Sequence, residues 1–315
     1  MVALSGRMKG MAVMLTALML VGCTAQGQVE NKSSESQSSV AVDALDTESS
    51  AGTPAPEYVE NTVEQSDDVT SGSETYRDFT LDNIYHSDIG DIHFNLYVPS
   101  DYDGTSPYAL FVTLPGWQGL YFQGVGVNLQ TEDFGFAAQD YIPDLIVAAP
   151  QLSGWDEQSG DEAVALTEYL LDAYNIDPDR VYIEGYSGGG ETLSQVLGKR
   201  PELYTAALLG ATQWDGDYQP VVEARTPVYL AVGESDEYYG PEPLREAYAT
   251  LRDLYRQEGL SDAEIDELLV IDVKDAGYFT ARGLSNQHGG GQAFADDPEI
   301  MGWLLGRDPN AELPG

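Results

Sequence analysis

Cysteine and histidine are scarce in this sequence. Its 315 residues include one cysteine and three histidines. A single cysteine excludes an internal disulfide, and it excludes metal sites built from several thiolates. The sequence also lacks a His/Cys cluster with metal-ligand spacing, a glycine-rich phosphate loop and a dinucleotide fingerprint. We therefore expect no metal and no other cofactor.

Basic residues are few as well. There are 14 Lys and Arg residues against 53 Asp and Glu residues, which gives a formal net charge of -39 at pH 7. A protein with this charge repels polyphosphate backbones and disfavours anionic substrates at long range. Nucleic-acid binding is therefore not expected. The excess of acid fits the solubility of an exported protein.

The apolar run near the N-terminus is short. Residues 11–21 follow two basic residues, and their length suits a signal peptide rather than a helix that crosses about 30 Å of hydrocarbon. The run ends in Leu-Val-Gly-Cys at residues 20–23, which resembles the lipobox of bacterial lipoproteins. We expect residues 1–22 to be removed and Cys23 to carry lipid, which would hold the protein at a membrane, facing outside the cytoplasm.

The next segment, residues 23–75, is rich in Ser, Glu, Gln and Asp and has no sustained apolar period. This composition predicts a disordered acidic tether. The remaining residues, 76–315, are enough for one large folded domain.

Within that domain, short apolar runs alternate with amphipathic helical stretches, which predicts an α/β fold with a mostly parallel central sheet and helices on both faces. The first two strands look like an antiparallel pair. Strands are expected at residues 79–84, 92–98, 108–114, 144–149, 180–184, 206–209, 228–232 and 269–273. Helices are expected at residues 131–140, 161–174, 188–198, 241–258 and 298–305.

A G-x-S-x-G motif at Gly185-Tyr186-Ser187-Gly188-Gly189 lies between a predicted strand and a predicted helix. In that context the serine sits on a sharp turn, and the flanking glycines relieve clashes with neighbouring backbone. The motif therefore predicts that Ser187 is a nucleophile.

A serine hydroxyl needs a base, normally a histidine that a carboxylate orients. His288 follows the last predicted strand and precedes three glycines, so a loop can bring it to the serine. His86 and His93 fall in or beside the first strand pair, before the central strands, and we interpret them as surface or strand residues. The sequence therefore predicts that His288 is the base.

The carboxylate is assigned to Asp236, which lies just past the end of the strand at 228–232, at the sheet edge where α/β proteins place active sites. Asp215 remains an alternative, and Glu234 is a weaker one. The chain order Ser187, Asp236, His288 is that of the α/β-hydrolase fold.

Two backbone N–H groups are needed to stabilise a tetrahedral oxyanion. We assign them to Gly188 and to Trp117 in the loop after the strand at 108–114. Aromatic residues also gather at strand ends, which suggests a pocket for an apolar or sugar-like group. The predicted substrate contacts are Tyr121, Phe122, Tyr186 and Trp214, and Trp155, Tyr238 and Tyr239 also follow strand ends.

Two segments carry a family resemblance: I-D-P-D-R-V-Y-I at residues 176–183 and G-Y-S-G-G-G at residues 185–190. Residues 90–306 resemble the α/β-hydrolase branch that contains polyhydroxybutyrate depolymerases, feruloyl esterases and prolyl-oligopeptidase-like domains. The resemblance implies an α/β-hydrolase fold and a serine nucleophile. One departure is that the family usually has His-Gly at the oxyanion loop, where this chain has Pro115-Gly116.

These observations predict a surface-anchored serine hydrolase that cleaves small-molecule or polymer-borne carboxylic esters through an acyl-enzyme. One alternative is a serine peptidase of the prolyl-oligopeptidase-like kind, using the same three residues on amides. The other is a non-catalytic surface-binding lipoprotein that keeps the hydrolase scaffold.

Overall fold

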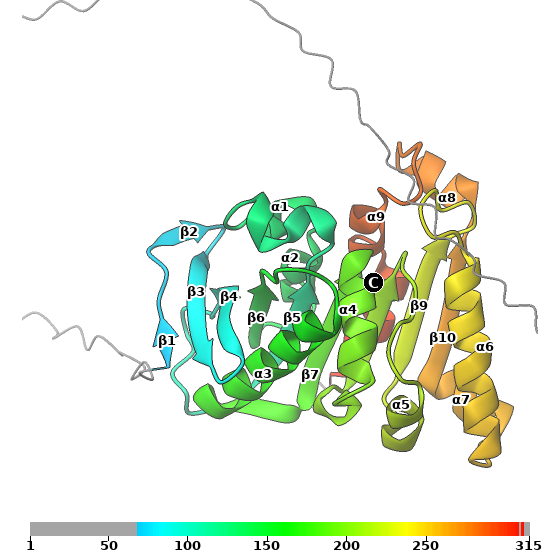
Figure 1. Ribbon diagram of the computed structural model, residues 1–315, viewed down its shortest axis with the longest axis horizontal. Helices are drawn as coiled ribbons and strands as arrows, with labels where there is room; N and C mark the ends of the chain where they lie inside the picture. The colour runs from blue at the N-terminus through cyan, green and yellow to red at the C-terminus, as the bar shows by residue number, and fades with distance from the viewer. Residues whose placement is uncertain (1–67, 309, 312–315) are drawn as a thin grey trace, which may run out of the picture. The chain divides into compact units, whose positions relative to one another are not determined.

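A ten-stranded sheet runs through the part of the chain that the computed structural model describes, which is residues 68–308, 310 and 311 (Figure 1). The strands are β1 (Val69–Thr70), β2 (Glu74–Tyr76), β3 (Phe79–Ser87), β4 (Gly90–Tyr97), β5 (Tyr108–Leu114), β6 (Leu145–Pro150), β7 (Ile176–Tyr186), β8 (Ala206–Gly210), β9 (Val228–Gly233) and β10 (Leu269–Lys274). Their order is β1-β3-β4-β6-β5-β7-β8-β9-β10, and β2 pairs with β3. The strands from β6 to β10 are parallel, whereas β3 and β4 form an antiparallel pair and β4 joins β6 antiparallel. The predicted mostly parallel sheet is confirmed.

Helices cover both faces of this sheet. They are α1 (Asn128–Thr131), α2 (Phe134–Gln139), α3 (Glu157–Ala173), α4 (Gly188–Leu197), α5 (Gln219–Ala224), α6 (Glu242–Gln257), α7 (Asp262–Leu268), α8 (Ala276–Ala281), α9 (Gly291–Ala295) and α10 (Pro298–Leu305), with 3-10 turns at Trp117–Gly119, Tyr121–Gln123 and Pro201–Leu203. Within the described residues, no helix is long and apolar enough to cross a membrane.

The side-chain alternation of β5 divides the core into two clusters. Leu110 and Val112 pack in one cluster with apolar residues of α3, α4 and α6, the helices in front of the sheet in Figure 1. Ala109 and Phe111 pack in the other cluster with residues of α2, α9 and α10. Because β5 is covered on both faces, its run is continuously apolar, as predicted for a central parallel strand.

Two sequence predictions need correction. The tether cannot extend to residue 75, because β1 and β2 already pair with β3, with Val69 opposite Tyr85 and Glu74 opposite Leu81. These strands have two and three residues, too short to produce an apolar period. The rest of the tether, the signal peptide and Cys23 lie outside the described residues. The helix predicted at 131–140 is divided into α1 and α2, because Glu132 has an extended backbone between them.

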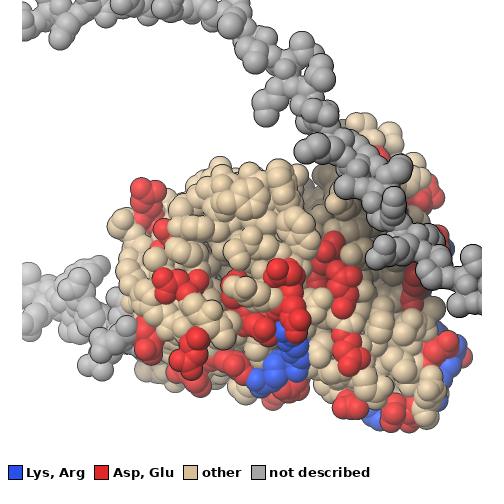
Figure 2. Space-filling view, in the orientation of Figure 1, with Lys and Arg blue, Asp and Glu red and all other residues tan. Residues whose placement is uncertain are grey.

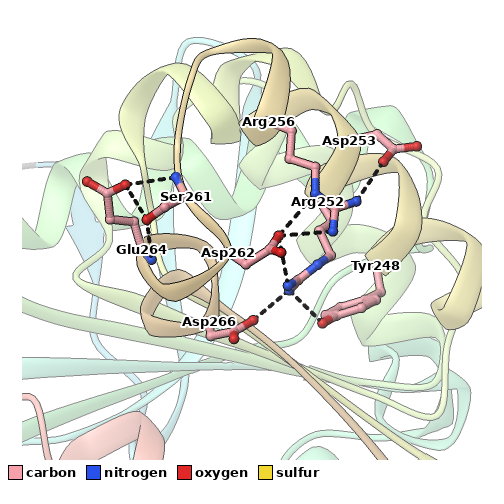
Figure 3. A network of polar contacts seen from close by, with 8 residues as sticks. All are labelled: Tyr248, Arg252, Asp253, Arg256, Ser261, Asp262, Glu264 and Asp266. Atoms are coloured by element: carbon pink, nitrogen blue, oxygen red, sulfur yellow. Dashed lines mark hydrogen bonds and ion pairs between the residues drawn. The ribbon is translucent and has the colours of Figure 1, made fainter.

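The corner between α6 and α7 fixes the approach to β10 (Figure 3). Ser261 and Glu264 form a capping box at the start of α7, which satisfies two backbone N–H groups. Asp262 accepts hydrogen bonds from Arg256 and forms an ion pair with Arg252, which also bonds to Asp266. These contacts hold α7 against α6, and α7 leads directly into the last parallel strand.

Candidate active site

Ser187 occupies a strained turn between β7 and α4. Its φ of 55° and ψ of -124° lie in a region that non-glycine residues rarely adopt. A Cβ added to Gly185 would lie 2.3 Å from the carbonyl oxygen of Gly189, and one added to Gly189 would lie 2.3 Å from that of Leu114. Glycine is therefore required on both sides, and the serine is presented at the carboxyl edge of the sheet.

The structure brings Ser187, His288 and Asp236 together in a line. The Ser187 Oγ lies 3.0 Å from the His288 Nε2, and the His288 Nδ1 lies 2.8 Å from the Asp236 Oδ2. The Asp236 side chain is fully buried, while the His288 side chain is 22% exposed. The imidazole thus has one nitrogen toward the hydroxyl and the other toward a buried carboxylate.

The Asp236 carboxylate is held in its charged form. Burial is the largest single influence and raises the Asp236 pKa. The hydrogen bond and charge of His288, together with the N–H groups of Tyr238 and Tyr239, lower the pKa by more than burial raises it, so the net shift is downward. The Asp236 Oδ1 accepts those N–H groups at 3.0 Å and 2.8 Å. A carboxylate stabilised in this way can orient the imidazole and stabilise its protonated form.

Two side chains tie the histidine loop to the loop after β9. The Glu237 Oε2 accepts the N–H groups of Gln287 and His288 at 2.8 Å and 2.9 Å. The Gln287 Oε1 accepts the Ser235 N–H at 2.8 Å. The loop that carries His288 is therefore held to the loop after β9 by hydrogen bonds that run in both directions between them.

The alternative acids lie elsewhere. Asp215 is exposed and accepts hydrogen bonds from Gln213, and the Glu234 Oε1 accepts the Ala276 N–H at 2.9 Å. Among the described residues, Asp236 is the acid that hydrogen-bonds to the His288 ring, so it is the carboxylate beside the imidazole.

The other two histidines are in the first strand pair. His86 lies between Thr70 and Asp91, and His93 bonds to Asp82 and stacks on Tyr121. This matches the expectation from the sequence.

The loop after β5 lies against the serine turn. A Cβ on Gly116 would lie 3.2 Å from the Tyr186 carbonyl oxygen and 3.6 Å from the Ser187 Cβ. Within residues 68–308, neither the Trp117 N–H nor the Gly188 N–H donates to a protein acceptor. Both amides are therefore available to a ligand oxygen.

Two cavities meet at Ser187 and His288. The first, which we call the aromatic cavity, has a volume of about 380 Å³. Besides Gln118, Ser187, Gly188 and His288, it is lined by Trp117, Trp155, Glu191, Tyr238 and Tyr239. The Tyr238 and Tyr239 rings lie 5.3 Å and 5.6 Å from the His288 ring.

The second, the polar cavity, has a volume of about 350 Å³ and shares Gln118, Ser187 and His288 with the first. Its other polar side chains are Thr131, Glu132, Tyr186, Asn286 and Gln292. The nucleophile thus stands between an aromatic compartment and a polar one.

A half-buried acid, Glu132, lines the polar cavity, and a fully buried one, Glu184, lies nearby. Burial raises the pKa of Glu132 to about 8. Glu184, the last residue before Gly185, is completely buried, and burial together with the charge of Glu132 raises its pKa well above the usual range. The Glu184 Oε2 accepts from Thr113, but its Oε1 has no partner among the described residues. Both groups therefore favour the neutral acid form near neutral pH.

Comparison with known proteins agrees with this geometry. Residues 153–255 match the prolyl oligopeptidase family. A thermostable esterase of known structure is 22% identical to the chain, with a TM-score of 0.59 over 75% of this chain and 64% of that one. The fold is that of the α/β hydrolases.

Two other solved structures are similar to the chain with lower TM-scores. Oligopeptidase B from Leishmania major is 15% identical, with a TM-score of 0.49 over 76% of this chain and 37% of that one. An S-formylglutathione hydrolase from Staphylococcus aureus is 13% identical, with a TM-score of 0.49 over 72% and 98%. No curated protein sequence matches the chain. The chain thus spans less than two thirds of the length of the thermostable esterase and of the oligopeptidase.

Of the four substrate contacts predicted from the sequence, Tyr186 is the one that lines either of these two cavities. Its hydroxyl donates to the His288 carbonyl at 2.8 Å, so it also supports the histidine loop. Tyr121 stacks on His93, and Trp214 stacks on Tyr218. Phe122 is 64% exposed and contacts the Trp117 ring from outside the two cavities. These three residues follow strand ends, as expected, but none of them lines either of the two cavities at Ser187.

The sequence prediction missed two acids that line the cavities, Glu191 in the aromatic cavity and Glu132 in the polar cavity. Glu191 follows Ser187 by four residues, so the helical repeat of α4 offered a signal for it. Glu132 offered none, because its position depends on the break between α1 and α2. Among the described residues, no group of three or more His, Cys, Asp and Glu could hold a metal ion.

Proposed function

We propose that this protein is a serine hydrolase that cleaves carboxylic esters through an acyl-enzyme, with Ser187 as nucleophile, His288 as general base and Asp236 as the group that orients it. The observation that carries the proposal is the 3.0 Å contact between the Ser187 Oγ and the His288 Nε2. A serine at a strained turn, next to an imidazole that is hydrogen-bonded to a buried carboxylate, is the arrangement that activates a hydroxyl.

In the acylation step, the Ser187 Oγ forms a bond to the ester carbonyl carbon while its proton passes to the His288 Nε2. The Asp236 carboxylate stabilises the imidazolium through the Nδ1–H. The negative oxygen of the tetrahedral intermediate accepts hydrogen bonds from the Gly188 and Trp117 N–H groups, which have no other acceptor among the described residues. The intermediate collapses as His288 gives its proton to the alcohol that leaves.

In the deacylation step, water replaces the alcohol. His288 takes a proton from the water as its oxygen attacks the acyl carbon, and the second tetrahedral intermediate uses the same two N–H groups. The Ser187 Oγ then leaves as His288 returns the proton to it. The products are a carboxylic acid and the regenerated serine.

Esters are the substrates to test first, because the fold likeness with the higher TM-score is to a thermostable esterase. Amide cleavage is the second candidate, and the match of residues 153–255 to the prolyl oligopeptidase family favours it. The same three side chains serve both reactions, so the choice depends on the two cavities and on the stability of the leaving group.

The decisive experiment labels the full-length protein with a fluorophosphonate probe and compares it with Ser187→Ala. We expect covalent labelling of the wild type and none of the variant. A panel of short-chain esters, aryl esters and peptidyl amides then ranks kcat/KM by leaving group. Folded wild-type protein that takes no label contradicts the proposal, and faster amide than ester turnover replaces it with the peptidase.

We also propose that Cys23 anchors the enzyme to a membrane, facing outside the cytoplasm. The sequence Leu-Val-Gly-Cys at the end of an apolar run supports this proposal. The test expresses the full chain and its Cys23→Ser variant in a bacterium fed with an alkyne-tagged fatty acid. We expect the wild type to carry the tag and to be found in the membrane fraction. The variant should carry no tag and should be absent from that fraction. An untagged wild type would refute the anchor.

A further inference from the structure

The aromatic cavity has more ring surface than catalysis alone requires. Trp117 is 49% exposed, Trp155 is 37% exposed and Tyr238 is 73% exposed, although all three line a cavity that contains Ser187 and His288. Large aromatic side chains left open to solvent around a reactive group indicate a surface that binds a ligand. The faces of such rings carry negative electrostatic potential, which attracts cations.

A carboxyl group lines the same cavity. Glu191 comes from the first turn of α4 and is only 7% exposed. The Glu191 Oε1 accepts a hydrogen bond from the Tyr239 hydroxyl. Burial is the largest influence on the Glu191 pKa and raises it, the Tyr239 hydrogen bond lowers it, and the neighbouring Asp215 carboxyl raises it, so the net shift is upward. No Lys, Arg or His among the described residues forms an ion pair with Glu191. A nearly buried acid without a cationic partner is costly unless a ligand compensates it.

The charge of the whole chain acts in the same direction. The formal net charge is -39, and acidic side chains are spread over the visible face of the domain while basic ones are confined to a few places (Figure 2). Such a field raises the local concentration of cations and lowers that of anions. A cationic ligand is therefore favoured both at long range and on contact.

We propose that the aromatic cavity binds a cationic group of the substrate, a quaternary ammonium or a protonated amine, between its exposed rings and the Glu191 carboxyl. The inference rests on the proposed function, since the cation belongs to the ester that Ser187 attacks. A neutral aryl group would also fill the cavity, but it would leave the Glu191 charge uncompensated. Glu191 and the rings are thus specificity-determining residues that do not take part in proton transfer.

The test uses two pairs of esters that differ by one charge. In the first pair, acetylcholine is compared with its carbon isostere, in which a tert-butyl group replaces the trimethylammonium group of the alcohol. In the second pair, the same replacement is made in the acyl group of an ethyl ester of trimethylammoniobutyrate. We expect kcat/KM to be roughly tenfold higher for the cationic member of one pair. Ionic strength is held high enough to screen the long-range field.

Two variants assign the preference to the cavity. Glu191→Gln keeps the shape and removes the charge, and Trp155→Leu removes a ring but keeps an apolar side chain. Each should lower the ratio of cationic to neutral kcat/KM several-fold. Asp253→Asn removes an equal charge from the exposed surface of α6, where the carboxylate pairs with Arg256, and should leave the ratio unchanged. Thermal melting of each variant checks that it is folded.

The outcomes separate the two proposals. Equal turnover of the cationic and neutral members in both pairs, with fluorophosphonate labelling intact, overturns the cation site and leaves the esterase standing. A preference that Glu191→Gln and Asp253→Asn reduce alike also overturns it, because the net charge would then be the cause. No turnover and no labelling of the folded wild type overturn both proposals.

Discussion

Glu237 accepts a hydrogen bond from the backbone of His288, with its Oε2 2.9 Å from the His288 backbone nitrogen. Glu237 touches neither Ser187 nor a cavity, so it is a positioning residue. The same oxygen accepts the Gln287 N–H, and together the two bonds hold the loop that carries the imidazole.

Replacing Glu237 with alanine should lower kcat about tenfold with a smaller change in KM, because a misplaced imidazole slows proton transfer more than it weakens binding. Glu237→Gln keeps a carbonyl acceptor and should restore part of the loss. Steady-state kinetics on a neutral ester provides the measurement. Equal kinetics for wild type and Glu237→Ala would show that Gln287 and Asp236 suffice to hold the loop.

Asp236→Asn and Asp215→Asn distinguish the two acids that the sequence left open. Asp236 bonds to the His288 ring, and an amide there cannot stabilise the imidazolium and favours the wrong tautomer. We expect Asp236→Asn to reduce kcat about a thousandfold or more. Asp215→Asn should retain kcat within a few-fold on a neutral ester, since Asp215 is exposed and its carboxylate lies beside Gln213 and Glu191 and not at the His288 ring. The reverse order of effects would reassign the acid.

The backbone strain at Ser187 predicts that replacing this residue with glycine stabilises the fold relative to replacing it with alanine. Its φ of 55° favours glycine, whereas alanine at the same position keeps the strain. Both Ser187→Gly and Ser187→Ala lose the hydrogen bond to His288, so the comparison isolates the backbone. Urea unfolding should show Ser187→Gly to be more stable than Ser187→Ala by about 1 kcal/mol. Equal stabilities would mean that the turn relaxes in the variants.

The sequence was informative where one local signal determines the structure. The apolar runs of β5, β6 and β9 predicted the central strands, since strands buried on both faces need apolar residues throughout. The motif around Ser187 predicted the turn, because glycine is sterically required beside it. Chain order and the glycines after His288 were sufficient to identify the histidine that the fold places beside the serine.

Other features depend on three-dimensional packing that no local pattern reports. Glu132 and Glu191 are two acids among 53 Asp and Glu residues, so nothing in the sequence distinguished these cavity-lining side chains from ordinary solvated acids. The ring of Trp214 follows a strand end as expected, but it stacks on Tyr218 instead of entering a cavity. Where a loop side chain points is decided by contacts made after the sheet has formed.

Glu132 makes stability depend on pH in a particular direction. Burial raises its pKa from 4.5 to about 8, so the folded state holds a proton that the unfolded state releases above about pH 4.5. The associated stability is fully present below pH 4.5 and is lost as the pH rises toward 8. Glu132→Gln removes this loss.

The free energy of unfolding, measured by urea from pH 5 to pH 9, should therefore fall in the wild type relative to Glu132→Gln. We expect the gap to widen up to about pH 8 and then to stay constant, at about 2 kcal/mol or more. A matched control is Glu299→Gln, whose side chain is 78% exposed. Parallel curves for wild type and Glu132→Gln would contradict the raised pKa.

Arg180, part of the segment that carried the family resemblance, has a structural role. Its guanidinium is almost completely buried, donating from Nε to the Asp308 Oδ2 at 2.7 Å and from both terminal nitrogens to Asp144 at 2.9 Å. These bonds join β7 to the end of the chain after α10 and to the residue before β6.

Removing one carboxylate of this network leaves the buried Arg180 charge with Asp144 as its remaining counter-charge. Asp308→Asn should therefore destabilise the fold by about 3 kcal/mol. The kcat on a neutral ester should be retained in the folded fraction, because Arg180 lies near the middle of β7, about 20 Å along the strand from Ser187. Asp253→Asn breaks the exposed pair with Arg256 and should cost at most about 0.5 kcal/mol. The double variant Arg180→Met/Asp308→Asn removes the under-compensated cation and should recover part of the loss, since the Asp144 side chain that remains is 30% exposed. A double variant with the summed cost of both single changes would show that the two side chains act independently.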